Sequence, residues 1–351
     1  MSTTEEHHDR TDTVLAIRFT GTGRDYARIW IVNLVLTLAT LGLYLPFARA
    51  RQLRYLRQHT LIEGEALDFD GDGRELLRPH LALLGALLLY TLIAHAAPLL
   101  AALLLLALAP AGPLLLRRML RWRLEHTLWR GQRLSFHGDE AQARRVFLPA
   151  AAPLALLLLG QALLAGQEDT GPDRSGWMLP ALVSLALLGL LMLVPWLHAR
   201  QRRYHHGHFG FGTERTRLDP AVEPADFYRL HGGVIALLLG ALAINAVFAA
   251  WIDTLLAAAP MLSGLLLDMT LVLALRAWLS ARTQDLLWNR TRSDRYRFVS
   301  DLPVPRLLMR SLKHLLLCVL TLGLYWPHAV MATTRLRLES VRIVRTQGST
   351  N

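Results

Sequence analysis

The ten residues Pro46–Tyr55 read PFARARQLRY and close an apolar run, Ile29–Phe47. Arg51 and Arg54 lie three positions apart, so in a helix they share one face. The same pattern returns as PWLHARQRRY at Pro195–Tyr204, again at the end of an apolar run. An apolar run that leads into an arginine-rich helix is typical of a membrane segment that reaches the cytoplasmic surface.

The composition follows the same alternation. Hydrophobic residues make up 53% of the 351 residues, yet the formal net charge is +11, and the two kinds of residue are gathered in separate blocks. Eight apolar runs approach the ~20 residues that a helix needs to cross the hydrocarbon core of a bilayer. They are Ile29–Phe47, Leu81–Ala97, Leu99–Leu116, Val146–Ala165, Trp177–Leu197, Gly233–Trp251, Leu255–Leu279 and Leu307–Pro327. Backbone groups in lipid must bond internally, which favours helices.

These runs predict an all-α, polytopic membrane protein with repeated transmembrane helical hairpins and short cytoplasmic connectors. Arginine is concentrated in four connections, which carry six, eight, six and seven arginines: Ala48–Pro79, Arg117–Arg145, His198–Arg229 and Arg276–Arg306. The positive-inside rule places these four in the cytoplasm. We expect an N-terminal cytoplasmic segment (residues 1–28), a membrane domain (29–327) and a basic C-terminal tail (328–351).

Internal similarity extends beyond the basic stretch. Thr40–Ala48 (TLGLYLPFA) is close to Thr321–Ala329 (TLGLYWPHA), near the other end of the chain. A Phe-Gly turn opens successive units, as in Phe19–Gly23 (FTGTG) and Phe69–Gly73 (FDGDG). The expected unit is therefore a Phe-Gly turn, a membrane hairpin, a proline, a basic helix and a short extended stretch.

The first and last apolar runs do not fit this unit as simple crossings. Each has only one apolar stretch between two cytoplasmic motifs, so a crossing would place a terminus outside, against the charge bias. A re-entrant or broken helix with its bend near Gly42 and Gly323 would keep both termini inside. Such backbone is tolerated where protein or water covers it. We favour the re-entrant form over the crossing.

The stretch from Phe19 to Phe69 resembles the YjgN-like family of bacterial inner-membrane proteins. The resemblance rests on the Phe-x-Gly-x-Gly turn, Trp30–Asn33, the Thr-Leu-Gly-Leu-Tyr-x-Pro-x-Ala-Arg motif and the Arg-x-x-Arg-Tyr motif. It implies a multi-pass protein of the inner membrane. The family is a domain of unknown function, so the resemblance implies no activity and no catalytic residues.

Four polar residues within the apolar runs form a candidate intramembrane site: Asp268, Asn245, His314 and Asn33. An ionisable group inside a membrane segment is costly, so it often marks a pathway or a relay. With repeats and broken terminal helices, this favours a transporter- or channel-like function. The alternative for Asp268 is a helix that begins later and leaves it at the outer interface.

Six arginines of the connectors are candidate contacts for anionic lipid headgroups: Arg51, Arg54, Arg118, Arg121, Arg200 and Arg203. They favour a second hypothesis, a non-catalytic membrane protein that organises anionic lipids or partner proteins. Plain topology anchoring is the simpler interpretation. The pI of about 10.7 would suit nucleic acid, but the arginines are spread over many connectors, so we expect no nucleic-acid partner. A homo-oligomer is left open.

Catalytic motifs are missing from the sequence. There is no Gly-x-Ser-x-Gly, no His-Glu-x-x-His and no pair of carboxylates at helical spacing within a run, so we expect neither an enzyme nor a cofactor. His205, His206 and His208 could seat a metal, but a solvated interfacial loop is the preferred interpretation. The single cysteine, Cys318, excludes an internal disulfide.

Overall fold

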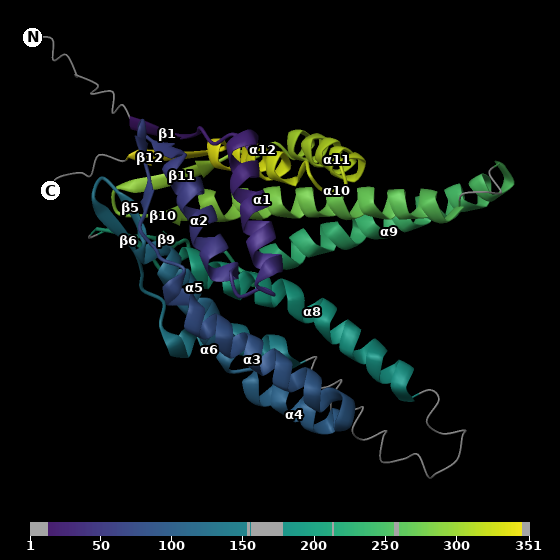
Figure 1. Cartoon of the computed structure of the whole chain (residues 1–351). Coiled ribbons are helices and arrows are strands. Elements are labelled where there is room, and N and C mark those ends of the chain that lie inside the picture. Colours follow the sequence, from purple (N-terminus) through teal and green to yellow (C-terminus); the bar gives the residue numbers. More distant parts are fainter. Residues whose placement is uncertain (1–12, 153–154, 156–177, 213, 256–259, 346–351) are drawn as a thin grey trace, which may run out of the picture.

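The computed structural model describes residues 13–152, 155, 178–212, 214–255 and 260–345. Helices alternate with short strands along the chain, and the long helices extend away from the strands toward one side (Figure 1). The helical elements are α1 (Gly23–Ala39), α2 (Leu45–Gln58), α3 (Arg74–Ala96), α4 (Pro98–Leu108), α5 (Ala111–Glu125), α6 (Glu140–Phe147), η1 (Leu148–Ala151), α8 (Met178–His206), α9 (Pro224–Leu255), α10 (Pro260–Asn289), α11 (Val304–Leu320) and α12 (Trp326–Glu339).

The strands form two antiparallel sheets, with the orders β3-β2-β1-β12-β11-β10-β9 and β4-β5-β6-β7-β8. The strands are β1 (Thr13–Phe19), β2 (Thr60–Ile62), β3 (Glu65–Ala66), β4 (Asp68–Phe69), β5 (Thr127–Trp129), β6 (Gln132–Phe136), β7 (Phe209–Phe211), β8 (Glu214–Arg215), β9 (Arg217–Leu218), β10 (Thr291–Arg292), β11 (Tyr296–Ser300) and β12 (Val341–Arg345).

The two sheets are joined at both edges, which makes a closed ring of strands. One residue, Leu67, separates β3 from β4, and one residue, Thr216, separates β8 from β9. The amide of Leu67 donates to the carbonyl of Thr60, and that of Thr216 to the carbonyl of Phe209, so pairing with the neighbouring strand continues across each join. The first strand, β1, pairs with both β2 and the last strand, β12. At each join the chain passes directly from one sheet to the other, and β3, β4, β8 and β9 each pair with one neighbouring strand.

The predicted all-α, polytopic fold is therefore wrong. The extended stretches after the basic helices pair with one another across the whole chain. Strands of two to seven residues are too short to leave a clear alternating pattern beside long apolar runs. Among the described residues, only Arg74–Ala96 and Val183–His206 are long and apolar enough to cross a membrane, by length and composition.

A recurring backbone contact joins each helix to the next strand pair. At five places around the ring, the residue that follows a strand donates its N–H to the carbonyl of the residue that lies between a helix and the strand after that helix. The pairs are Thr20 to His59, Asp70 to His126, His137 to His208, Asp219 to Arg290, and Asp301 to Ser340, with N···O distances of 2.9 to 3.2 Å. The buried core is likewise divided into five small clusters.

The Phe-Gly segments are tight loops that lie at these joints. In the second loop the ring of Phe69 covers Gly71, where a Cβ atom would approach the ring to 2.6 Å. Arg54 of α2 donates to the carbonyls of Phe69 and Gly71 at 3.2 and 3.3 Å. Trp122 of α5 packs edge-on against Phe69, with ring centroids 5.3 Å apart. Only glycine fits beneath the ring, which explains why this motif is present in the sequence.

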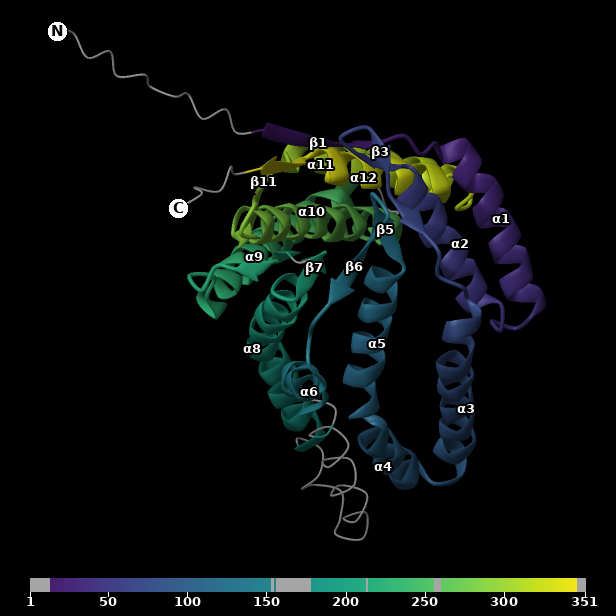
Figure 2. The same ribbon diagram turned by 90° about the vertical axis from the view of Figure 1, so that its left-hand side faces the viewer.

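The first and last helical pairs turn back sharply. Helix α1 ends at Ala39 and α2 begins at Leu45, with Gly42 at φ +90° between them. Helix α11 ends at Leu320 and α12 begins at Trp326, with Gly323 at φ +87°. The predicted run Ile29–Phe47 is therefore two helices rather than one. Figure 2 shows a longer pair, α3 and α5, joined through α4 at the end far from the strands.

Candidate functional site

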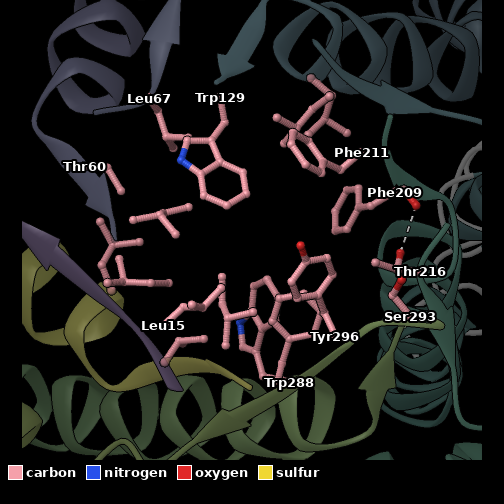
Figure 3. A pocket seen from close by; sticks show the side chains of 18 of the residues that line it. Leu15, Thr60, Leu67, Trp129, Phe209, Phe211, Thr216, Trp288, Ser293 and Tyr296 are labelled. Carbon is pink, nitrogen blue, oxygen red and sulfur yellow. Dashed lines mark hydrogen bonds between the residues drawn. The ribbon is translucent and has the colours of Figure 1, made fainter. Parts of the chain in front are cut away.

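The ring of strands encloses a cavity of about 560 Å³. Its walls are mostly apolar and aromatic, because strand side chains alternate between the inside and the outside of the ring. Figure 3 shows Leu15, Trp129, Phe211, Trp288 and Tyr296 arranged around the open space. They come from β1, β5, β7, α10 and β11. Residues from both ends of the chain thus line one cavity.

Basic side chains line the same cavity from the helices. Arg57 lies in the last turn of α2, Arg123 in the last turn of α5 and Arg337 in the last turn of α12. His205, near the end of α8, also lines the cavity. Cations are stabilised near the C-terminal end of a helix by its dipole. The C-terminal turns of several helices therefore bring positively charged side chains to the cavity inside the strand ring. We call Arg57, Arg123 and Arg337 the arginine cluster.

The arginines of the cluster have lost solvent and lie close to other positive charges. The loss of solvent around Arg57, together with the nearby charge of Arg123, lowers the pKa of Arg57 to about 10. Loss of solvent lowers the pKa of Arg123 as well, and the charge of Arg49 adds to this effect. The pKa of Arg337 is lowered by desolvation and by the charge of Arg276. Keeping each of these arginines charged in the folded protein therefore costs free energy.

Carboxylates do not balance this cluster. None of the ion pairs between described residues includes Arg57, Arg123 or Arg337. Arg337 instead donates from Nε to Oε1 of Gln284 at 3.0 Å. Glu214 lines the cavity, but it pairs with Arg295 at 3.3 Å and accepts from Ser293 at 2.6 Å. An apolar cavity with unbalanced guanidinium groups suits an organic anion that has an apolar body.

A comparison with protein families identifies the group to which the sequence belongs. The family model described as "Bacterial protein of unknown function (DUF898)" matches residues 14–350. The chain belongs to this DUF898 family. YjgN-like is another name for it, so the resemblance seen in the sequence is confirmed. No curated protein and no solved structure matches the chain.

Three of the six candidate lipid-binding arginines of this DUF898 protein have partners within the chain. Arg54 holds the loop of Phe69, Arg121 pairs with Glu125 at 2.6 Å, and Arg200 lies over the ring of Trp196 at 4.4 Å. Such contacts position the helices. Tyr55 and Trp122 are buried against the Phe-Gly loops.

The other three arginines, Arg51, Arg118 and Arg203, have exposed side chains. Nothing in the structure tests whether they contact lipid headgroups, so that contact remains a prediction. Arg118 lines a second cavity, described below. The exposed arginines are separate from the arginine cluster, which lies inside the ring.

The structure describes the side chains of two of the four candidate intramembrane residues, Asn33 and His314. Asn33 donates from Nδ2 to the carbonyl of Ala48 at 3.3 Å. The ring of His314 lies 5.7 Å from that of Tyr325, at the other end of the chain. Asn245 and Asp268 fall within α9 and α10, but their side chains lie outside the described part of the chain. A relay through Asp268 thus remains a prediction.

The histidines after Arg203 have separate partners. Nδ1 of His208 lies 2.7 Å from the carbonyl of Tyr204. His206 is buried edge-on against Trp288, with ring centroids 5.2 Å apart. Within the described residues there is no group of three or more His, Cys, Asp or Glu side chains that could hold a metal. The part of the chain that the structure describes therefore offers no candidate metal site.

The arginine cluster was not predicted from the sequence. Arg57 follows Arg51 and Arg54 at the same three-residue spacing, and nothing in that spacing distinguishes it from them. The signal that distinguishes it is its place in the final helical turn, immediately before a strand that enters the ring. Arg123 and Arg337 share this place. Recognising it required knowledge that the following stretches close a ring.

Proposed function

We propose that this DUF898 protein is a non-enzymatic membrane protein that binds an organic anion with an apolar body inside its strand ring, in a transporter- or channel-like role. The observation that carries the proposal is the position of the arginine cluster in an apolar cavity of about 560 Å³. Guanidinium groups recognise carboxylate and phosphate oxygens through paired N–H donors. Fatty acids and other anionic amphiphiles combine such a head with an apolar chain.

The membrane setting is part of the proposal. Leu83, Leu87, Leu88 and Leu92 of α3 are each more than half exposed, and a soluble helix rarely leaves so many large apolar side chains in water. The exposed leucines of α8, among them Leu185 and Leu187, support the same placement. Helices α3 and α8 would enter the bacterial inner membrane, which would make the chain a multi-pass protein with the strand ring and the arginine-rich connectors on the cytoplasmic side.

The two terminal turns support re-entrant segments. Leu41 and Leu322, at the tips, are 90% and 94% exposed. All amide groups from Thr40 to Leu45 nevertheless have partners within the turn, including Gly42 to the Thr37 carbonyl at 2.7 Å and Tyr44 to Thr40 Oγ1 at 3.0 Å. The turn at Leu322 repeats these bonds. A turn whose donors are satisfied internally can enter hydrocarbon, where water is not available.

The five recurring joints lead us to propose five copies of one unit around the ring. In this view, four copies contribute a continuous hairpin of strands, and the fifth hairpin is formed by the terminal strands β12 and β1. The support is the repeated N–H to carbonyl bond at each joint. Such an arrangement would bring basic helix ends to one axis, as the arginine cluster requires.

Binding of a fluorescent fatty acid tests the proposal. Energy transfer from tryptophan to 11-(dansylamino)undecanoate is measured with the full chain in amphipol, because Trp129 and Trp288 line the cavity. We expect the acid to bind and its uncharged methyl ester to bind at least about tenfold more weakly, as expected for hydrogen bonds to a charged group. Arg57→Gln and Arg123→Gln are expected to weaken binding of the acid to a similar extent.

The control variant is Arg51→Gln, on the same helix as Arg57 but exposed and absent from the cavity lining. It is expected to bind the acid like the unmodified protein. Equal binding of acid and ester, or unchanged binding by both cluster variants, would contradict the proposal. Transport is then measured as uptake of the same acid into proteoliposomes.

Organisation of anionic lipids is a second candidate function. The specific observation in its favour is that Arg51, Arg118 and Arg203 keep exposed side chains. Replacing all three by Gln is expected to weaken cosedimentation with vesicles that contain phosphatidylglycerol. Cosedimentation that stays intact would rule out this role for the three residues.

A further inference from the structure

A second cavity, of about 480 Å³, lies between α1, α2, α3 and α5. It is separate from the strand ring, since none of its lining residues lines the first cavity. Its wall is largely apolar and includes Leu34, Leu83, Leu115 and Met119. Leu34, Leu83 and Met119 are also exposed on the outside. The apolar wall therefore continues onto the surface that we place in the membrane.

The lining of this second cavity also includes two positively charged side chains. Arg49 and Arg118, from α2 and α5, both line it. Neither takes part in an ion pair within the described part of the chain. His80 also lines the cavity, and its Nε2 lies 2.9 Å from the carbonyl of Gly42. That contact occupies the His80 nitrogen and links α3 to the turn between α1 and α2.

Asn33 gives this cavity a hydrogen-bond acceptor that has no donor. Its Nδ2 is used by the carbonyl of Ala48, but its Oδ1 is buried and has no hydrogen-bond partner. A buried acceptor without a donor is unfavourable, because it has lost its hydrogen bond to water. Asn33 lines the cavity, so a bound molecule with an O–H or N–H group can supply the missing donor.

We infer that this second cavity is a binding site for one phosphatidylglycerol molecule of the membrane. Arg49 and Arg118 match the charge of the phosphate, a hydroxyl of the headgroup glycerol donates to Asn33 Oδ1, and the acyl chains lie along the exposed leucines. A phosphatidylcholine headgroup offers no donor to Asn33 and carries a cation toward the two arginines. The inference rests on the proposed membrane setting, but not on a ligand inside the strand ring.

Native mass spectrometry of the full chain in detergent tests the site, with lipid added in molar excess. We expect one phosphatidylglycerol to be retained, with about tenfold higher affinity than phosphatidylcholine, the effect of one charged-group hydrogen bond. Free glycerol 3-phosphate, which has the head without the chains, is not expected to compete. Competition by it at equal concentration would identify a soluble-phosphate site and overturn the proposal.

Asn33→Leu and Arg118→Gln are each expected to reduce retention of phosphatidylglycerol by about tenfold. Arg118 is exposed, so its replacement leaves folding intact even if the Asn33 variant does not fold. Arg49 is left unchanged, because its charge also acts on Arg123 of the arginine cluster. Arg28→Gln is the matched control, because Arg28 is exposed on α1, the helix of Asn33, and does not line the second cavity; it is expected to retain the lipid.

Arg57→Gln separates this inference from the proposed function. It should lose the dansyl fatty acid but keep phosphatidylglycerol. Loss of phosphatidylglycerol in Arg57→Gln would place the lipid in the strand ring and overturn the second site. Full retention in both Asn33→Leu and Arg118→Gln would overturn it as well, whatever the result for the fatty acid.

Discussion

Arg335 of α12 donates from Nε to the carbonyl of Phe19, the last residue of β1, at 3.1 Å. Its Nη2 donates to the carbonyl of Gly21 at 3.0 Å. Arg54 holds Phe69 and Gly71 in the same way. The contact that elsewhere links neighbouring segments here joins residues 316 positions apart. Together with the pairing of β1 and β12, it closes the ring.

Replacing Arg335 by Ala should therefore destabilise the closure of the ring. Two hydrogen bonds from a charged donor are lost and two carbonyls lose a partner, so we expect the free energy of unfolding to fall by about 2 kcal/mol. Urea unfolding in mild detergent measures this change. Arg335→Lys should not restore stability, because a single ammonium does not reproduce the paired donors of a guanidinium.

Arg342→Ala serves as the control for Arg335. Arg342 lies on β12, is exposed, and makes no side-chain hydrogen bond or ion pair within the described residues. Its replacement should change stability by less than about 0.5 kcal/mol. If the free energy of unfolding falls equally in both variants, the contact of Arg335 with the Phe-Gly loop is not what closes the ring.

Gly71→Ala tests the packing of the Phe-Gly loops. A Cβ at Gly71 would lie 2.6 Å from the ring of Phe69 and 2.8 Å from that of Trp122. Both rings are buried, so the loop must shift, at a cost of about 1–3 kcal/mol. The midpoint of thermal unfolding in detergent measures the change, which should be a decrease.

Gly85→Ala is the matched control, since a Cβ there meets no atom within 4 Å. Gly85 lies within α3, where Ala is favoured over Gly by roughly 0.5–1 kcal/mol. This variant should therefore be as stable as the unmodified protein or more so. A loss of stability at Gly85 equal to that at Gly71 would remove the steric explanation for the Phe-Gly loops.

Local motifs could be predicted from the sequence, whereas the strand ring could not. The repeated Phe-Gly and Arg-aromatic motifs could be read directly, because each is a local pattern. The bends at Gly42 and Gly323 could be located in the same way, from glycine within an apolar run. The ring could not be predicted, because strands such as Asp68–Phe69 and Arg217–Leu218 pair with partners distant in sequence. The role of Arg57 depends on that ring, so it was missed too.

Leu41 should lie in the hydrocarbon of the bilayer if the first turn is re-entrant. Cys318, the single native cysteine, is first replaced by Ala. A nitroxide is then attached at Leu41→Cys or Leu322→Cys in proteoliposomes. Collisions with oxygen should exceed those with a polar nickel reagent at both positions, because oxygen concentrates in lipid and the nickel reagent does not.

Val14→Cys is the control for these labels, because Val14 is 55% exposed on β1 of the strand ring, outside the proposed membrane segments. The nickel reagent should reach this position more readily than oxygen. A water-exposed pattern at Leu41 and Leu322 would contradict re-entrant turns. A C-terminal reporter that is active in the periplasm would contradict them independently, since re-entrant turns keep both termini in the cytoplasm.

Arg57→Met should separate stability from binding. The pKa of Arg57 is lowered to about 10, chiefly by desolvation, so the charged form is disfavoured in the folded protein relative to the unfolded chain. Met keeps an unbranched apolar stem and removes the charge, so the ligand-free protein should gain about 1–2 kcal/mol, after allowance for the partial exposure of Arg57. Binding of the dansyl fatty acid should fall at the same time, because the anion loses a cationic partner. Thermal unfolding without ligand and energy-transfer titration measure the two effects on the same preparation. A structural role for Arg57 would produce the opposite result for stability, a loss in the free protein, and would remove the main support for an anion site in the ring.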